Sequence, residues 1–394
     1  MAPTKPKSKS QKNRGNDRLR AKNSTSQGPA VNARELLAKS TALLEAGDPE
    51  SAAKAARLAY ETIGENGRQA GAALSLLGQI QVELGNIDTA RNFFAAAVRA
   101  DEDGTLPEDL GGGPEKFLWL AQLSEEGGRD SITWFDRGAA ALRAQIQTFS
   151  EKLDSLPRTR NEQEVIIAEK RRKLAETLCA VTEVYMTDLS WEDNAEQRCE
   201  ALITEAIMLA PEVAETWQTV ANVRISQTRT DEAREALKRS LGLWINLPPE
   251  DPTVPPFPSR VSLVRLLIEV GMEENAIEVT ERLVDEDDQS VESWYLGGYG
   301  KYVLGEKTRL AAADSDAENW QKIWRSSRKW LAQCLRIYEF EEYEDERLRD
   351  HARELLALIK NELGEPMEGN DDDIWEDTDD DDDGGGGEED AEMQ

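Results

Sequence analysis

The sequence predicts an all-α fold, a superhelical solenoid of paired helices between two disordered ends. Three observations predict it. A two-helix motif recurs along the chain, apolar residues recur at helical spacing in its later part, and long runs of like charge lie near the two ends. Because each helix pair of such an array leaves an apolar face that only its neighbour can cover, the repeats are expected to stack around one continuous core.

The two end segments differ in charge from the middle of the chain. Residues 1–30 hold eight Lys and Arg against the single acid Asp17, and residues 365–394 hold sixteen Asp and Glu with no Lys or Arg. Neither segment has enough apolar residues to bury a core. We therefore predict a basic disordered arm over 1–30, a folded body over 31–364 and an acidic disordered tail over 365–394. The body itself keeps about −22 of the total charge of −31.

The repeats have the residue pattern of the tetratricopeptide repeat, in which small residues let two helices approach and large apolar residues fill the gap to the next pair. The clearest copy, LSLLGQIQVELGNIDTARNFFAAAV, has Leu77, Gly78, Gly85, Ala90, Phe94 and Ala97 at the expected offsets. A second copy has Trp217, Ala221, Ala233, Leu237 and Ser240. Weaker copies surround Gly47 and Gly271, and from Ala276 the register continues to Trp294 and Gly298. These copies predict a tetratricopeptide-repeat solenoid.

Other parts of the body depart from the repeat. Two long connections, DSLPRTRNEQE at 154–164 and NLPPEDPTVPPFPSR at 246–260, are predicted to be ordered excursions. Further on, an apolar stripe at helical spacing predicts core packing rather than a cofactor site; it consists of Trp320, Ile323, Trp324, Leu331 and Leu335. The last helix is predicted to end at Gly364 and to cap the solenoid with a face of Leu348, Ala352, Leu355, Ile359 and Leu363.

The segment GGGPEKFLWLAQL, residues 111–123, suggests either a phosphate-binding loop or the start of a helix. A phosphate-binding loop needs a Lys and a hydroxyl after its glycines, between a strand and a helix. That context is missing, Glu115 would face the phosphate, and Pro114 suits a first helical turn. We therefore predict that Gly111–Gly113 form a flexible hinge before the first helix of a third, irregular pair, whose second helix is DSITWFDRGAAALRAQI.

Composition excludes several function classes. The acidic body repels nucleic acid and anionic membranes, and no run of about 18 apolar residues or apolar signal segment is present, so we expect an intracellular protein. The three cysteines lack a CxxC, which predicts buried thiols rather than disulfides or a metal site. The single histidine, His351, has no nucleophile motif, and we expect neither enzymatic activity nor a cofactor.

The irregular pair also carries a family resemblance. GGGPEKFLWLAQLSEEGGRDSITWFDRGAAALR resembles the matching segment of a fungal family of tetratricopeptide proteins, the dedicated assembly chaperones of the ribosomal protein uL4. The acidic tail and the repeats around Gly78 and Trp217 fit the same family, so the likeness spans most of residues 32–380. The resemblance implies a chaperone that captures newly made uL4, shields its long basic internal loop and accompanies it into the nucleus for delivery to pre-60S particles.

The repeat register also predicts a binding groove. Positions 2, 5, 9, 12 and 13 of the first helix of each pair line the concave face of a tetratricopeptide superhelix. In this sequence they include Glu45, Glu83, Glu215, Gln218, Asn222, Glu269, Glu292, Tyr295, Tyr299 and Tyr302. Carboxylates bind Lys and Arg, and tyrosine rings stack on their side chains. A basic extended segment, such as the internal loop of uL4, is therefore the predicted ligand.

Two other binding functions are open to a tetratricopeptide protein. A heat-shock co-chaperone would grip a carboxylate with cations, whereas the predicted groove positions are acidic or aromatic. A general nuclear scaffold for basic partners remains the alternative to the uL4 chaperone. We expect a monomer in the cytoplasm and nucleus that reaches a nuclear import receptor through its client and binds neither nucleic acid nor membrane.

Overall fold

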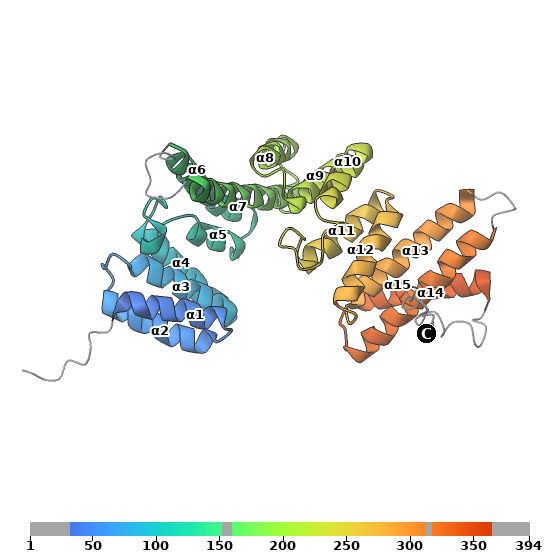
Figure 1. The fold of residues 1–394 in the computed structure, drawn as a ribbon, viewed down its shortest axis with the longest axis horizontal. Coiled ribbons are helices and arrows are strands. Elements are labelled where there is room, and N and C mark those ends of the chain that lie inside the picture. Colours follow the sequence, from blue (N-terminus) through green and yellow to red (C-terminus); the bar gives the residue numbers. More distant parts are fainter. Residues whose placement is uncertain (1–31, 152–159, 312–316, 365–394) are drawn as a thin grey trace, which may run out of the picture. The chain divides into compact units, whose positions relative to one another are not determined.

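The computed structural model describes residues 32–151, 160–311 and 317–364 (Figure 1). These ranges contain fifteen α-helices and one short 3-10 helix and no strand, which confirms the predicted all-α class. The predicted arm and tail lie outside the described residues, as does the first part of the predicted excursion at 154–164. No helix in the described ranges combines the length and the apolar composition that a membrane crossing requires.

The helices group into two compact units. Unit 1 comprises the described residues up to Thr177 together with Thr187–Trp191, and unit 2 comprises Leu178–Met186 with the described residues from Glu192 onward. Unit 1 contains α1 (Ala33–Glu45), α2 (Pro49–Ile63), α3 (Ala70–Glu83), α4 (Ile87–Ala100), η1 (Glu108–Leu110), α5 (Glu115–Gln122), α6 (Gly128–Glu151) and the larger part of α7 (Arg160–Met186). Unit 2 contains α8 (Ala195–Leu209), α9 (Ala214–Ser226), α10 (Thr230–Gly242), α11 (Phe257–Glu269), α12 (Glu273–Glu286), α13 (Val291–Ala311), α14 (Ala317–Phe340) and α15 (Glu346–Leu363).

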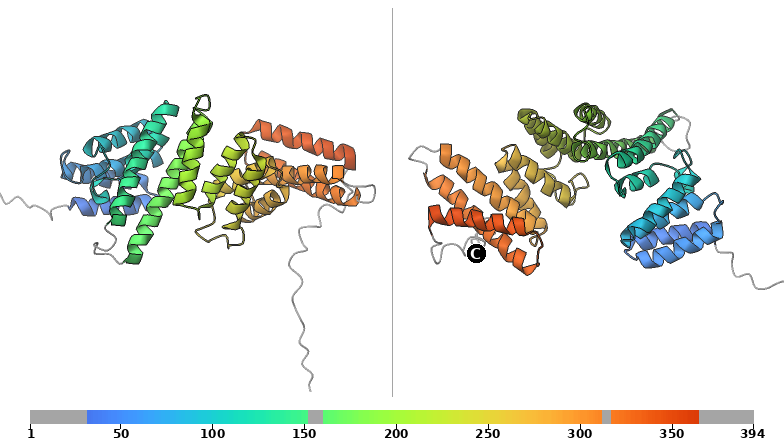
Figure 2. Two further views of the ribbon diagram at one scale, coloured as in Figure 1. Left: turned by 90° about the horizontal axis from the view of Figure 1, so that it is seen from above. Right: turned by 180° about the vertical axis from the view of Figure 1, so that it is seen from behind.

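The predicted repeats are helix pairs in the structure. Within unit 1, α1 packs on α2, α3 on α4 and α5 on α6, and within unit 2, α9 packs on α10, α11 on α12 and α13 on α14. The views from above and behind show the paired helices side by side in each unit (Figure 2). The copies read from the sequence around Gly78, Trp217 and Trp294 are therefore confirmed as tetratricopeptide pairs.

The small residues of the motif act as predicted, by letting two helices approach closely. A Cβ added to Gly78 on α3 would lie 2.7 Å from the ring of Phe94 on α4, which is itself fully buried. In the later pair, a Cβ on Gly297 of α13 would lie 2.2 Å from the ring of Trp330 on α14. Any larger side chain at either glycine would push the two helices apart.

Buried serines join the two helices of four pairs. In each, the hydroxyl donates a hydrogen bond to a backbone carbonyl of the partner helix: Ser40 to Ala52 O at 2.8 Å, Ser131 to Ala121 O at 2.8 Å, Ser240 to Ala214 O at 2.9 Å and Ser327 to Gly298 O at 2.7 Å. None of the four side chains is more than 6% exposed. Since a buried hydroxyl without a partner is costly, these bonds favour one alignment of each pair.

The proline-rich connection at 246–260 is ordered, as predicted. The Arg282 guanidinium on α12 donates to the carbonyls of Ile245 and Leu247, while Arg260 donates to Pro255 O at 2.9 Å and pairs with Glu286 at 2.6 Å. The two arginines satisfy carbonyls that the connection leaves outside any helix.

The C-terminal end of unit 2 also follows the prediction. Trp324 and Leu331 of α14 are buried against Leu355 and Ile359 of α15. The last helix ends at Leu363, and Gly364 follows with φ of +80°. The apolar stripe is therefore core, and α15 covers the last repeat as a cap.

The glycine triplet starts a helix, as predicted, but it is not a hinge. Helix α5 begins at Glu115, directly after Pro114. Gly111 has φ of +86°, and a Cβ there would lie 2.1 Å from the backbone nitrogen of Ala72 on α3. The prediction of a flexible hinge is wrong, because the triplet is packed against α3 and glycine is needed for the close approach.

The lysine of the GGGPEK segment is buried in this loop. Lys116 is 1% exposed, and its Nζ lies 2.6 Å from Asp101 Oδ2 and 3.1 Å from Gly111 O. Asp101 Oδ1 accepts from the backbone nitrogens of Thr105 and Leu106. The pair therefore ties the end of α4, the 101–113 loop and the start of α5 together and leaves no free lysine for a phosphate.

Candidate client-binding surface

The α9 residues predicted for the groove share one face of that helix. Glu215, Gln218 and Asn222 are three and four residues apart, a spacing that puts them on adjacent turns. Glu215 and Asn222 are partly exposed, whereas Gln218 is only 7% exposed. The Gln218 Nε2 group is buried and has no hydrogen-bond partner among the described residues. This face therefore exposes one carboxylate and one amide, while the Gln218 amide is buried beneath it.

On α11 and α13 the predicted acidic residues have a basic neighbour. Glu269 at the end of α11 is exposed, but Glu292 on α13 lies 2.5 Å from the Arg265 guanidinium of α11. Arg265 was not among the predicted groove residues, although it precedes Glu269 by one turn and so shares its side of α11. The surface at Glu292 is therefore an ion pair and not a free carboxylate.

The three predicted tyrosines lie along α13 and pack inside unit 2. Tyr295 and Tyr299 stack with ring centroids 6.2 Å apart, and Tyr302 stacks on Trp324 of α14 at 5.2 Å. All three are partly buried. Burial raises the pKa of Tyr295 to about 12, so its phenol stays neutral. The rings already have internal partners, and stacking on a client stays a prediction.

The only histidine of the chain connects these tyrosines to the cap. The Tyr295 hydroxyl lies 2.7 Å from Nδ1 of His351 on α15, and the His351 ring meets Tyr299 edge-on at 5.5 Å. Sequence reasoning recognised no partner for His351, because the contact joins residues 56 positions apart on two helices. A histidine held in this way supports α15 and is not arranged for nucleophilic catalysis.

A pocket of about 370 Å³ opens where these residues meet. It is lined by Arg265, Glu292, Tyr295, Leu296, Asp345, Arg347, Leu348 and His351. Only Glu292 and Tyr295 were predicted for the groove. The pocket thus combines two cations, two carboxylates and an apolar floor, which suits an extended peptide with mixed side chains better than a purely cationic one.

In unit 1 the two predicted carboxylates lie at helix ends. Glu45 is the last residue of α1 and Glu83 the last of α3, and both are exposed. Neither lines the 430 Å³ pocket between α1, α3 and the glycine loop. The carboxylates there are Glu108, Asp109 and Glu115, of which Glu108 pairs with Lys170 at 2.7 Å and Glu115 with Lys173 at 2.5 Å.

The described residues form neither a metal site nor a redox site that could take the place of a client-binding surface. They contain no group of three or more His, Cys, Asp and Glu side chains placed to hold a metal ion. The three cysteines are buried, as predicted, and form no disulfide with one another. Burial raises the pKa of the Cys334 thiol to about 12.

Comparison with known proteins gives close relatives. The tetratricopeptide repeat family matches residues 72–103, which span α3 and α4. An Emericella nidulans protein named probable assembly chaperone of rpl4 is 46% identical over 342 residues, 85% of this chain and 83% of that protein. A Schizosaccharomyces pombe protein of the same name is 30% identical over 322 residues, 81% of this chain and 89% of that protein.

One solved structure is also very similar. It is described as the assembly chaperone of RpL4 (Acl4), residues 1–338, and is 74% identical in sequence. The alignment covers 72% of this chain and all of that one, with a TM-score of 0.69. The shared fold and the shared sequence therefore extend well beyond a single repeat.

Proposed function

Because this chain belongs to the fungal family of assembly chaperones of the ribosomal protein Rpl4, we propose that it is a dedicated chaperone of that protein, uL4. It binds newly made uL4, shields the basic internal loop and escorts the client to nuclear pre-60S particles. The names of the relatives support the choice of client. Shielding of the loop and escort to the nucleus are parts of the proposal that those names do not mention.

The observation that supports this function most is a pair of accessible carboxylates on the predicted groove helices, Glu215 on α9 and Glu269 on α11. Glu215 and Glu269 have no ion-pair partner among the described residues and remain at least partly accessible. Such carboxylates attract Lys and Arg, while the apolar lining of the adjacent 370 Å³ pocket adds contacts that salt does not screen. A chaperone needs both, because charge attracts the client and burial keeps it bound.

The remaining parts of the proposal follow from the same chemistry. The protein acts without catalysis and as a monomer in the cytoplasm and nucleus, and the client supplies the contact with an import receptor. Its negative charge opposes direct binding to nucleic acid. A general scaffold for basic nuclear proteins is the competing function, and it would accept many unrelated partners.

The proposal is tested by measuring the affinity of the full chain for uL4, for uL4 without its internal loop and for the loop alone, from low to high salt. We expect tight binding of uL4 and the loop, and much weaker binding of the loop-deleted protein. Affinity should fall with salt and then level off, since screening over about 8 Å removes the charge attraction but not the buried contacts.

Controls separate the competing functions. An unrelated basic protein of similar charge should bind weakly and lose all binding at moderate salt. Equal affinity for that protein and for uL4 would support the scaffold. Failure to bind uL4 or its loop at any salt concentration would refute the chaperone function.

A further inference from the structure

The most basic helix of this acidic protein is α14 in unit 2. It contains five Lys and Arg against Glu318 and Glu339. Four of the cations occupy one outer face at helical spacing, and we call this set the basic stripe: Lys322, Arg325, Lys329 and Arg336. Three of them are exposed and Lys329 is partly buried.

Most of the stripe lacks an anionic partner. Lys322 pairs with Glu318 of its own helix at 3.2 Å, whereas the structure, over its described ranges, gives no ion pair or hydrogen bond to Arg325, Lys329 or Arg336. The Nζ atom of Lys329 is inaccessible to solvent and unpartnered. A buried ammonium without a hydrogen bond is costly, so this face lacks an acceptor.

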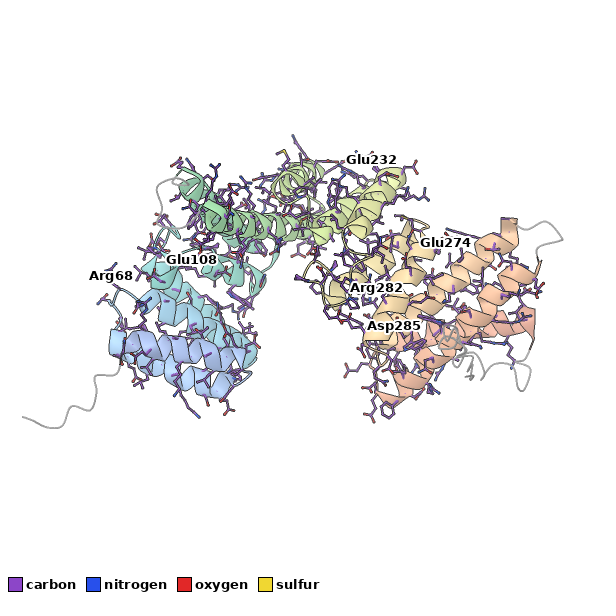
Figure 3. All side chains as sticks on the ribbon, in the orientation of Figure 1. Arg68, Glu108, Glu232, Glu274, Arg282 and Asp285 are labelled. Carbon is purple, nitrogen blue, oxygen red and sulfur yellow. The ribbon has the colours of Figure 1, made fainter. Side chains whose placement is uncertain are left out.

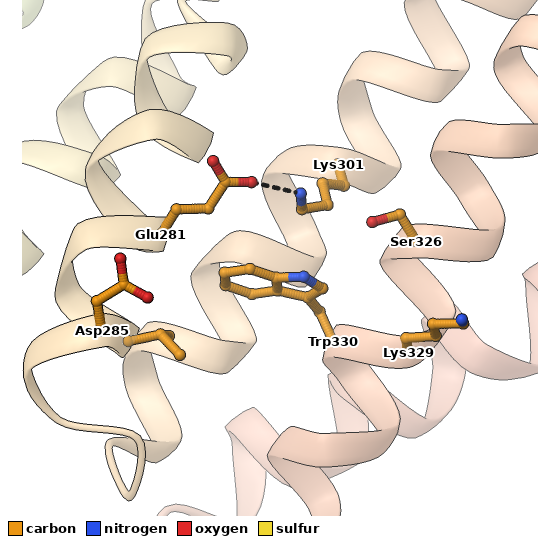
Figure 4. A pocket seen from close by; sticks show the side chains of 7 residues that line it. Glu281, Asp285, Lys301, Ser326, Lys329 and Trp330 are labelled. Carbon is orange, nitrogen blue, oxygen red and sulfur yellow. Dashed lines mark hydrogen bonds and ion pairs between the residues drawn. The ribbon is translucent and has the colours of Figure 1, made fainter. Parts of the chain in front are cut away.

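The neighbouring pocket does not supply that acceptor. Lys329 lines a pocket of about 290 Å³ with Trp330, Glu281 and Asp285. Figure 4 shows the Lys329 amine directed away from Trp330, while Lys301 pairs with Glu281 at 2.9 Å across the pocket. The carboxylates of α12 are thus on the other side of Trp330, and Lys329 belongs to the stripe.

The described chain ends beside this helix. The Arg328 guanidinium on α14 lies 3.5 Å from the carbonyl oxygen of Gly364, which follows α15. Residues 365–394 come next in the sequence, with sixteen Asp and Glu and no Lys or Arg. Their first acidic run is Asp371–Asp373, and a longer one occupies Asp379–Asp383. The most acidic segment of the chain therefore starts next to its most basic helix.

We propose that the acidic segment 365–394 docks on the basic stripe of α14 within the same molecule. Seven residues from Gly364 span up to roughly 24 Å, and the stripe is about 21 Å long, so the first acidic run reaches every stripe residue. One exposed ion pair contributes little, but four cations facing a tethered polyanion act together at millimolar effective concentration. The segment also brings acceptors, which the Lys329 amine would meet by turning outward from its buried position.

Docking would neutralise the basic stripe, a face of unit 2 that attracts anions. Nucleic acid, which follows positive potential, would find no cationic helix to bind. The same carboxylates would also be held away from basic side chains of a client. The proposal concerns the outer face of α14 and does not depend on the identity of the client.

The test is zero-length carbodiimide crosslinking of the full chain, which joins carboxylates to lysine amines, followed by mass spectrometry. We expect links from residues 365–394 to Lys322, whose side chain is exposed, and to Lys329 once its amine turns outward to the segment. The variant Arg325→Glu, Arg336→Glu keeps both lysines as reporters and should lower these links at least about fivefold, because half of the attraction is reversed. The matched control, Arg57→Glu with Arg68→Glu, reverses two exposed arginines of unit 1 (Figure 3 labels Arg68) and should leave the links unchanged.

Other outcomes would overturn the proposal. Equal linking to Lys39 and Lys54 of unit 1, or no decrease in the α14 variant, would mean that the segment has no preferred site. A mixture of light and heavy isotope-labelled protein identifies links between two molecules. If about half of the links in an equimolar mixture joined a light to a heavy chain, as random pairing of two molecules gives, the stripe would bind the acidic segment of a second copy rather than its own.

Discussion

The hydroxyl of Tyr295 on α13 and Nδ1 of His351 on α15 lie 2.7 Å apart, and this hydrogen bond fastens the capping helix to the last repeat. Replacing Tyr295 by Phe removes the bond and keeps the ring. We expect the free energy of unfolding to fall by about 0.5 to 1.5 kcal/mol, measured by urea denaturation. Tyr343→Phe is the control, because that hydroxyl has no hydrogen bond within the described part of the chain, and it should cost less.

The same tyrosine predicts a dependence on alkaline pH. Burial raises the pKa of Tyr295 from 10 to about 12. An acid whose pKa is higher in the fold contributes stability that is complete below pH 10 and is lost as pH rises towards 12. The free energy of unfolding should therefore fall between pH 10 and 12, and it should fall less steeply in Tyr295→Phe. If the free energy of unfolding fell equally steeply with pH in both proteins, Tyr295 would be no more buried in the fold than in the unfolded chain.

Charge reversal on the proposed binding face should weaken client binding. Glu215→Lys with Glu269→Lys turns two attractions into repulsions and should lower affinity for the uL4 loop at least about tenfold at low salt. Calorimetry checks this. Glu292 is a poor choice, because a lysine there would be placed beside Arg265.

The control for that experiment changes the same charge elsewhere in unit 2. Glu274→Lys with Glu278→Lys alters two exposed residues of α12 (Figure 3 labels Glu274). Affinity should change little, by less than about threefold. If both double variants weakened binding equally, the client would respond to total charge and not to this face.

The buried pair of Lys116 and Asp101 should be strongly coupled. Lys116→Met leaves a buried carboxylate without its cation and should cost about 3 to 5 kcal/mol of unfolding free energy. Adding Asp101→Asn removes the second charge and should recover part of that loss. Lys173→Met, which breaks the exposed pair with Glu115, is the comparison and should cost less than about 1 kcal/mol. Additive effects of the two buried substitutions would contradict the coupling.

The glycine loop allows a matched pair of alanine substitutions. Gly111 and Gly85 both have a positive φ, of +86° and +72°. A Cβ at Gly111 would collide with the backbone of α3, whereas a Cβ at Gly85 would have no atom within 4 Å. Gly85→Ala should cost about 1 kcal/mol through backbone strain alone. Gly111→Ala should cost more than about 3 kcal/mol, because α3 must also move. Thermal unfolding of the two variants measures the difference. Equal losses of stability would mean that the glycine loop can move away from α3 at little cost.

The helices could be predicted from the sequence because their signals are local. Gly78, Trp217 and Gly364 each mark a position within one motif, and the structure places all three as expected. The packing role of Gly78 also follows from its offset to Phe94, since the motif fixes which helices touch. Repeat architecture thus converts local spacing into tertiary contacts.

What could not be predicted depends on contacts between distant residues. Arg265 beside Glu292 and His351 beside Tyr295 involve side chains on separate helices, and no spacing rule connects them. The glycine triplet shows the same limit in another form. Glycine permits unusual backbone angles, but only the structure shows that Gly111 is needed because Ala72 lies against it.

The serine bonds inside the helix pairs restrict how the length of this protein can change in evolution. An insertion of one residue within α10 would rotate everything after it by about 100°, and Ser240 would turn away from Ala214 O. A gain or loss of three or four residues nearly restores the alignment of the serine with its carbonyl, and a gain or loss of seven residues restores it best. Length variants of these helices should therefore occur in whole turns, while single-residue insertions should be confined to the connections between helices.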